Sequence, residues 1–352
     1  MSGQAEGERD NNFGALRLAF AALVVVSHSA EMVDGNRSRE ILSRVFGTMT
    51  FGEFAVDGFF LVSGYLIAKS FAQQPQIIRY LGKRCLRIVP AYLAAFWICV
   101  LAVAPFAGGA HSPLFIEGLL KSNLLLEAPE VGPVFQGLAY PMLNGPMWTI
   151  SYEFFCYLAV GAIGAACIKL GILAARGRWA LLVGTAFGLV FAGSGIYPSN
   201  AIGLATVFGV GALFYLFRGE IVLNGKGAIV CALLMAAALY NRYLAEAGVA
   251  VFGGYVLFWL ALKTKAVKTG LADGKTDISY GLYLYAWPIQ NLLIWNQRDI
   301  NPWILCAVSL VSAGLAGYAS WHLIEKRALG LARRFDDPRK PVLVCLSAAR
   351  AS

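Results

Sequence analysis

Arg17 and His28 lie eleven residues apart in one apolar stretch of the chain, LRLAFAALVVVSHSAEMV. At about 100° per residue, this spacing puts both side chains on one helix face, roughly 16 Å apart along the axis. A cation at the centre of a membrane helix costs roughly 2.5–3.5 kcal/mol on the insertion scale, so its presence there requires a reason. The aligned pair predicts a polar path across a membrane, with an imidazole on that path.

Two carboxylates are expected at the depth of His28. With the topology derived below, Asp57 and Glu153 both fall in the outer half of the membrane, and Glu53 shares a helix face with Asp57. A histidine with a carboxylate in reach is the minimum set for general base catalysis, because the carboxylate orients the ring and stabilises its protonated form. We therefore predict His28, Asp57 and Glu153 as catalytic residues.

Each of these residues also has a purely structural explanation. His28 is compatible with a place at the membrane interface, and Arg17 with a side chain that extends to the cytoplasmic headgroups or pairs with a carboxylate. Glu53 is expected only to mark the entrance of a span. Acids as deep as Asp57 and Glu153 are usually functional or paired. The common depth of the three candidates favours the functional interpretation.

Ser63 in LVSGYL is a weak candidate nucleophile. It follows Asp57 by six residues, about 240° around a helix, so the two side chains do not share a face. Gly64 does share the face of Asp57. We expect Ser63 and Gly64 to mark close packing between helices, rather than a nucleophilic site.

A dense group of cations occurs in RYLGKRCLRIVP, and it includes Arg84 and Arg87. One explanation is an anchor that holds the chain at the cytoplasmic face of the membrane. The other is a binding site for a phosphorylated cytoplasmic ligand, because guanidinium groups match phosphate oxygens well. Both interpretations stay open at this point.

An aromatic stripe is predicted further along the chain. Tyr280, Tyr283, Trp287 and Asn291 recur at intervals of three and four, which places them on one side of a helix. Such a stripe is more often packing than a surface on which a ligand stacks, and packing is the expectation here.

The elements that position all these residues are membrane helices. The 352 residues are 58% hydrophobic and only 14% charged, against about 25% charged in soluble domains. Apolar runs of span length recur throughout, which predicts an all-α, polytopic membrane protein with about ten transmembrane helices. The runs cover residues 13–33, 50–71, 88–107, 147–168, 179–196, 201–218, 227–243, 247–263, 278–296 and 302–325.

The basic charges follow this topology. With the N-terminus in the cytoplasm, 22 Lys and Arg residues fall in inside segments and 6 in outside segments. This bias predicts that both termini are cytoplasmic. The net charge of +9 is therefore explained by topology, with anionic lipid headgroups as a further partner, and no nucleic-acid binding is expected.

The chain is expected to form one membrane domain. We predict a cytoplasmic tail over residues 1–12, a ten-helix domain over 13–325 and a basic cytoplasmic tail over 326–352. The longest outside connection, about 108–146, includes an amphipathic piece near Pro113–Leu126 and is a candidate cap for an outer site. The seven cysteines form no CxxC pair, so we expect neither a metal site nor a disulfide framework.

Five segments together carry a resemblance to a known family. They are LRLAFAALVVVSHS, FAVDGFFLVSGYLIAKSF, RYLGKRCLRIVPAY, GPMWTISYEFFCYL and ISYGLYLYAWPIQ. In this order and spacing, they resemble the acyltransferase-3 family of integral membrane O-acyltransferases, which modify bacterial surface polysaccharides such as exopolysaccharide and lipopolysaccharide. Many relatives have His where this chain has Ala286, and a second acid where it has Phe154. No catalytic histidine is therefore assigned to the ninth run, and Glu153 is the single acid of its motif.

The resemblance implies a function and a mechanism. The donor would be cytoplasmic acyl-CoA, with acetyl-CoA preferred, and its phosphates would bind Arg17, Arg84 and Arg87. The acceptor would be a hydroxyl of an extracytoplasmic or lipid-linked glycan. His28 would act as general base or as an acyl relay, supported by Asp57 or Glu153. The expected location is the inner membrane of a bacterium.

A different class of function remains compatible with aligned intramembrane charges. A transporter or flippase for a glycan precursor would use them as a translocation path without covalent chemistry. Transporters often contain two related halves, and no internal repeat is visible in this sequence.

Overall fold

The computed structural model describes residues 11–108, 115–171, 174–193, 200–267, 269–272 and 276–332. Within these residues the chain is helical and contains no β-strand, which confirms the predicted all-α class. The predicted tails 1–12 and 326–352, and Pro113, lie largely or wholly outside the described residues. The helices are α1 (Phe13–Glu31), α2 (Ile41–Phe46), α3 (Phe51–Gln73), α4 (Ile77–Ile98), α5 (Ala104–Phe106), α6 (Phe115–Leu125), α7 (Trp148–Lys169), α8 (Ala174–Gly193), α9 (Asn200–Leu216), α10 (Gly225–Ala238), α11 (Ala245–Gly248), α12 (Gly254–Lys263), α13 (Ser279–Asn296), α14 (Pro302–Ser320) and α15 (Lys326–Ala332).

Short π-helical segments join some of these helices into longer rods. Cys99–Val103 connects α4 to α5, Val249–Gly253 connects α11 to α12, and Trp321–Glu325 connects α14 to α15. A π-helical turn accommodates one extra residue while the helix continues. The joined helices therefore reach span length even though each is interrupted.

Six helical stretches among the described residues are long and apolar enough to cross a membrane. They are Phe13–Glu31, Phe51–Gln73, Ile77–Phe106, Gly145–Lys169, Ala245–Lys263 and Pro302–Ala332. Three shorter apolar helical stretches lie within α8, α9 and α10. Each of the ten predicted apolar runs falls on a helix, whereas the count of about ten spans and the cytoplasmic termini stay predictions.

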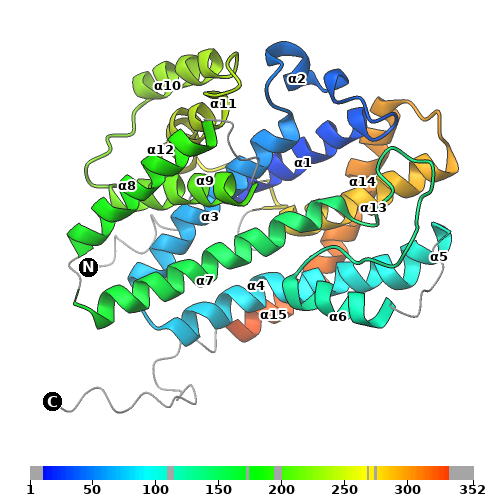
Figure 1. The fold of residues 1–352 in the computed structure, drawn as a ribbon, viewed down its shortest axis with the longest axis horizontal. Helices are drawn as coiled ribbons and strands as arrows, with labels where there is room; N and C mark the ends of the chain where they lie inside the picture. Colours follow the sequence, from blue (N-terminus) through cyan, green and yellow to red (C-terminus); the bar gives the residue numbers. More distant parts are fainter. Residues whose placement is uncertain are drawn as a thin grey trace.

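The helices α9, α3, α1, α13 and α14 pack in that order, each against the next. Helix α7 packs on α3 and α4 from one side, and it runs across the front of the view in Figure 1. The group α8 to α12 lies at the upper left of that view, and α4, α6 and α15 lie along the lower edge. Helices α1, α3, α7 and α13 thus surround the interior that carries the predicted site residues.

Glycines set the closest approach in this arrangement. A Cβ on Gly64 of α3 would lie 2.0 Å from the backbone oxygen of Phe208 in α9, and one on Gly211 of α9 would lie 2.1 Å from the oxygen of Leu61. Only hydrogen fits at these two positions, so each backbone presses against the other. The prediction of close helix packing at Gly64 is confirmed.

The first turn of α3 is fixed by a capping box. The Thr50 side chain accepts a hydrogen bond from the backbone N–H of Glu53, and the Glu53 carboxylate accepts one from the backbone N–H of Thr50 at 2.8 Å. This reciprocal cap satisfies two N–H groups that a helix terminus leaves without partners. It starts α3 at Phe51 and places Asp57 in the second turn, which confirms that Glu53 marks the helix entrance.

Candidate active site

The predicted site residues line two adjoining cavities in the helical interior. The outer cavity has a volume of about 700 Å³ and is bordered by His28 and Asp57. The inner cavity measures about 100 Å³ and is bordered by Arg17 and Glu153. Val56 and Tyr283 belong to the walls of both. Arg17 and His28 thus both reach the interior from α1, and each borders one of two cavities that share part of their walls.

His28 is held by an aromatic contact. Its ring meets the Trp287 indole edge to face, at 4.8 Å between centroids and an interplanar angle of 90°. The Nδ1 atom is buried and has no hydrogen-bond partner among the described residues. A buried ring nitrogen without a protein partner is available to a hydroxyl group that enters the cavity. The indole holds the plane of the imidazole ring and forms no hydrogen bond with either imidazole nitrogen.

Asp57 shares the outer cavity with His28, as the depth argument predicted. The residue is 5% exposed, and its carboxylate has no hydrogen bond or ion pair within the described chain. No direct hydrogen bond joins Asp57 to His28 there. The two groups therefore line one space in which a small bound molecule could contact both.

Charged groups surround the mouth of the outer cavity. Arg37 donates to Glu53 at 2.7 Å and lies 3.4 Å from a carboxylate oxygen of Glu31. Arg242 and Glu246 border the same space. Because these groups are mixed in sign, the mouth is polar and suits an acceptor rich in hydroxyl groups.

Arg17 and Arg87 in the wall of the inner cavity form a buried ion-pair junction with Asp277. Arg17 and Arg87 both donate to the same oxygen of Asp277, at 2.9 and 2.6 Å. Ser279 donates to the other carboxylate oxygen from its backbone and from its side chain. Burial opposes ionisation of Asp277, but Arg17 and Arg87 beside it hold the pKa of this carboxyl below its ordinary value.

Arg84 is the third predicted cation of the inner cavity, and it donates a hydrogen bond to a neutral side chain. Its guanidinium donates to the Ser70 hydroxyl at 3.1 Å, and its Nε is buried without a partner among the described residues. The structure brings Arg17, Arg84 and Arg87 to one cavity, as predicted. Since Asp277 neutralises only one of two guanidinium charges, the cluster keeps capacity for an anion.

Glu153 lies in the inner cavity, away from the position expected beside His28. Its carboxylate accepts hydrogen bonds from Ser63 of α3 and, at 2.5 Å, from Tyr157 one turn along α7. Depth in the membrane does not fix the direction in which a helix points its side chains, and α7 faces α3 here. Ser63 is accordingly a hydrogen-bonding partner of Glu153, a role that the packing interpretation missed.

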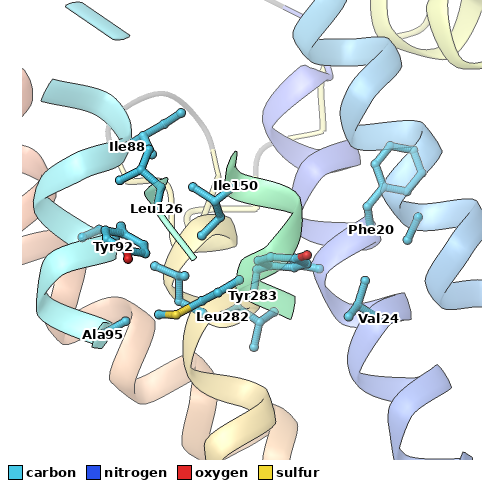
Figure 2. Packing of buried hydrophobic residues seen from close by; sticks show 14 of the residues in the cluster. Phe20, Val24, Ile88, Tyr92, Ala95, Leu126, Ile150, Leu282 and Tyr283 are labelled. Carbon is cyan, nitrogen blue, oxygen red and sulfur yellow. The ribbon is translucent and has the colours of Figure 1, made fainter. Parts of the chain in front are cut away.

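Tyr283 forms the boundary between the two cavities. Its hydroxyl lies 2.7 Å from Thr149 Oγ1 and donates to the Pro146 carbonyl at 2.9 Å. Figure 2 shows its ring extending from α13 toward the side of α1 that carries Val24. The aromatic stripe predicted as packing therefore borders the functional space, because Tyr280 lines the inner cavity and Trp287 the outer one.

Sequence reasoning missed Asp277, Tyr283 and Trp287 as parts of the site. Asp277 lies 260 residues from Arg17 along the chain, and no spacing rule relates the two. The available signal was an acid directly before an apolar run, in TDISYGLYLY, where a charge is costly to bury without a partner. No group of three or more His, Cys, Asp or Glu residues with metal-binding geometry occurs in the described part of the chain.

Comparison with known proteins defines the class of this protein. The family described as "Acyltransferase domain" matches residues 10–321. The chain is 29% identical over 341 residues to the "O-acetyl transferase" of Shigella phage Sf6, covering 91% of this chain and 96% of that protein. It is 26% identical over 361 residues to "Nodulation protein 10" of Rhizobium leguminosarum bv. viciae, covering 91% and 94%.

A third relative is similar over a shorter region. It is "Acyltransferase MdmB" of Streptomyces mycarofaciens, 26% identical over 144 residues, which are 40% of this chain and 35% of that protein. No solved structure matches the chain. The molecule is thus an acyltransferase with apolar helices of membrane-spanning length. More specifically, the chain belongs to the acyltransferase-3 family.

Proposed function

We propose that this enzyme transfers an acetyl group from cytoplasmic acetyl-CoA to a hydroxyl of an extracytoplasmic or lipid-linked glycan, in the inner membrane of a bacterium. The likeness to a phage O-acetyl transferase over nearly the whole of both chains supports transfer of acetyl to oxygen. The observation that carries the proposal is the pair of cavities that share Val56 and Tyr283, with cations in the wall of one and the histidine in the wall of the other.

The inner cavity is the proposed donor end. Coenzyme A is an anion with phosphate groups, and Arg17, Arg84 and Arg87 offer guanidinium donors for such oxygens. With about 100 Å³ of space, the cavity suits the narrow pantetheine arm better than the nucleotide. The nucleotide phosphates would accordingly bind these arginines from the cytoplasmic mouth of the inner cavity. The thioester would extend past Val56 and Tyr283.

The outer cavity is the proposed acceptor end. His28 takes the proton from the acceptor hydroxyl as that oxygen attacks the thioester carbonyl, and Asp57 stabilises the resulting imidazolium. The C–S bond of the thioester breaks, the ester C–O bond forms, and the thiolate leaves as CoA. In the relay alternative, a bond from His28 nitrogen to the acyl carbon forms as the C–S bond breaks and the CoA thiolate leaves. The acceptor oxygen then attacks that carbon, the ester C–O bond forms, the N–C bond breaks, and the imidazole takes the hydroxyl proton.

The decisive test measures transfer by purified protein in lipid nanodiscs. The substrates are radiolabelled acetyl-CoA and surface glycan from the source cell, stripped of its O-acetyl groups with alkali. We expect His28→Ala to lower the rate roughly 10²–10⁴-fold, the usual contribution of a general base. His322→Ala is the matched control, because His322 packs on Tyr318 and borders neither cavity.

Other outcomes separate the alternatives. Full activity of folded His28→Ala protein would overturn the assigned role of the histidine. A wild-type protein that moves the glycan across a bilayer but forms no labelled ester would be a transporter, and the proposed function would then be wrong.

A further inference from the structure

A further cavity of about 630 Å³ adjoins the outer cavity. Met142 and Trp148 belong to the walls of both. Each of the two spaces falls within the ~300–1,000 Å³ that ligand sites usually occupy. The outer cavity therefore has a neighbouring cavity of comparable size, which we call the side compartment.

The walls of the side compartment combine aromatic rings with carboxylates. Trp148 and Tyr152 meet edge to face at 5.5 Å between centroids, and Phe155 continues this aromatic side along α7. Glu127 and Glu130 belong to the same lining; both are exposed, and neither carboxylate has a side-chain hydrogen bond or ion pair among the described residues. Flat apolar rings beside carboxylates that accept hydrogen bonds suit a molecule with both C–H faces and hydroxyl groups.

The segment between α6 and α7 that forms these walls is firmly anchored. Tyr92 donates to the carbonyl of Glu127 at 2.8 Å, and Ser151 donates to the carbonyl of Leu126 at 3.0 Å. At the other end, Asn291 and Trp287 donate to the carbonyl of Met142, at 2.9 and 3.3 Å. Bonds to the backbone at both ends fix the shape of the compartment.

The same segment contains the two non-glycine residues of positive φ in the described chain, Leu126 at 58° and Phe135 at 51°. Both are buried, at 6% and 0% exposure. This conformation costs a residue with a Cβ of order 1–3 kcal/mol, and it persists only where the surroundings hold it. Such local strain is compatible with a wall that is shaped for a ligand, and it argues against a loose connecting loop.

We propose that the side compartment is a second saccharide subsite, so that the acceptor is an oligosaccharide or polysaccharide bound by at least two sugar units. One unit occupies the outer cavity beside His28, and its neighbour lies on the Trp148 and Tyr152 rings with its hydroxyl groups donating to Glu127 and Glu130. The proposal deepens the proposed function and rests on it. The two carboxylates disfavour a phosphate or an acidic sugar in this compartment, because they repel anions.

The test compares two acceptors made from one glycan. They are the de-O-acetylated surface polysaccharide of the source cell and the single sugar units released from it by complete acid hydrolysis. With labelled acetyl-CoA in nanodiscs, Tyr152→Ala and Glu130→Gln should each raise KM for the polymer about fivefold to tenfold. We expect kcat, and KM for the single unit, to stay within about twofold of wild type, a change of less than ~0.5 kcal/mol.

Matched controls exclude general damage. Tyr318→Ala removes an exposed tyrosine of α14, and Glu220→Gln removes an exposed acid that pairs with Arg178; neither residue lines the side compartment. Both controls should leave the two KM values unchanged. The variants also separate the subsite from an aromatic anchor at the membrane interface, since an anchor would alter protein yield and not KM.

Each result has a distinct meaning. Equal wild-type KM for the polymer and the single unit would overturn the subsite, as would variants that shift both values together or neither. Transfer to neither acceptor by wild-type protein would instead contradict the proposed function. A polymer-specific rise in KM supports both.

Discussion

At the scale of single residues, two predicted cations of the site share one carboxylate that was not among the predicted site residues. Asp277 joins Arg17 and Arg87 through one oxygen, and its side chain is only 7% exposed. The two cations were predictable because each is costly in or beside an apolar run. Their shared partner was not, because the contact joins α1 and α4 to a residue that precedes α13.

Asp277→Asn tests this junction. The change leaves two largely enclosed guanidinium groups without a countercharge, and breaking a buried pair in this way costs roughly 3–5 kcal/mol. We expect a clearly lower melting temperature for the purified protein in detergent. Glu220→Gln, which breaks the exposed pair with Arg178, should cost only about 0–1 kcal/mol. Equal losses in the two variants would contradict the buried junction.

The pH dependence of the stabilisation by the Asp277 ion pair follows from the direction in which the pKa of Asp277 is shifted. Because the pKa of Asp277 is lower in the folded protein than its ordinary value, the ion pair stabilises the fold above roughly pH 4. The stabilisation is lost only as the pH falls through the folded-state pKa. The difference in melting temperature between wild type and Asp277→Asn should therefore be the same at pH 8 and pH 5.5.

At the scale of elements, apolar runs predicted helices well and their lengths less well. Every run falls on a helix, because a long apolar stretch in lipid must satisfy its backbone internally. The apolar stretches of α8, α9 and α10 are shorter than span length. Where a helix points its side chains was also beyond prediction, and Glu153 faces Ser63 for that reason.

The crossing of α3 and α9 gives a prediction at this scale. Gly64→Ala would bring a methyl group to 2.0 Å from the Phe208 carbonyl oxygen, so the helices must separate. Overpacking of this kind typically costs about 1–3 kcal/mol. We expect a lower melting temperature and reduced yield of folded protein. Gly184→Ala in α8, where a Cβ meets nothing within 4 Å, should be neutral or slightly stabilising.

At the scale of the whole molecule, two cavities meet at Tyr283. The outer cavity is bordered by His28 and Asp57, and the inner cavity by Arg17, Arg84 and Arg87. The depth argument put His28 and Asp57 at a similar level, and the angle around the helix put Ser63 on another face than Asp57. In the structure, His28 and Asp57 line the outer cavity and Ser63 lines the inner one. Neither argument predicted that the aromatic ring of Tyr283 would lie between the two cavities. Under the proposed function, a ring at this position limits the space for water between the acceptor end and the donor end.

Tyr283→Ala should therefore allow acetyl-CoA to be hydrolysed when no acceptor is bound. Removing the ring leaves room for water beside the acyl chain that extends past this position, so the thioester is hydrolysed and CoA is released without any glycan present. We expect acceptor-independent hydrolysis of acetyl-CoA to rise several-fold, measured as free thiol. Tyr283→Phe keeps the ring but loses the bonds to Thr149 and Pro146, and it should hydrolyse acetyl-CoA slowly, like wild type. No increase in a folded Tyr283→Ala protein would exclude a sealing role.

The anchoring of the segment between α6 and α7 has an evolutionary consequence. Tyr92, Ser151 and Asn291 hold it through backbone carbonyl groups, which every amino acid carries. The exposed side chains of Glu127 and Glu130 are therefore free to change while the backbone path stays the same. An enzyme built in this way can diverge toward new acceptors by substitution along one wall, without having to find a new fold for each.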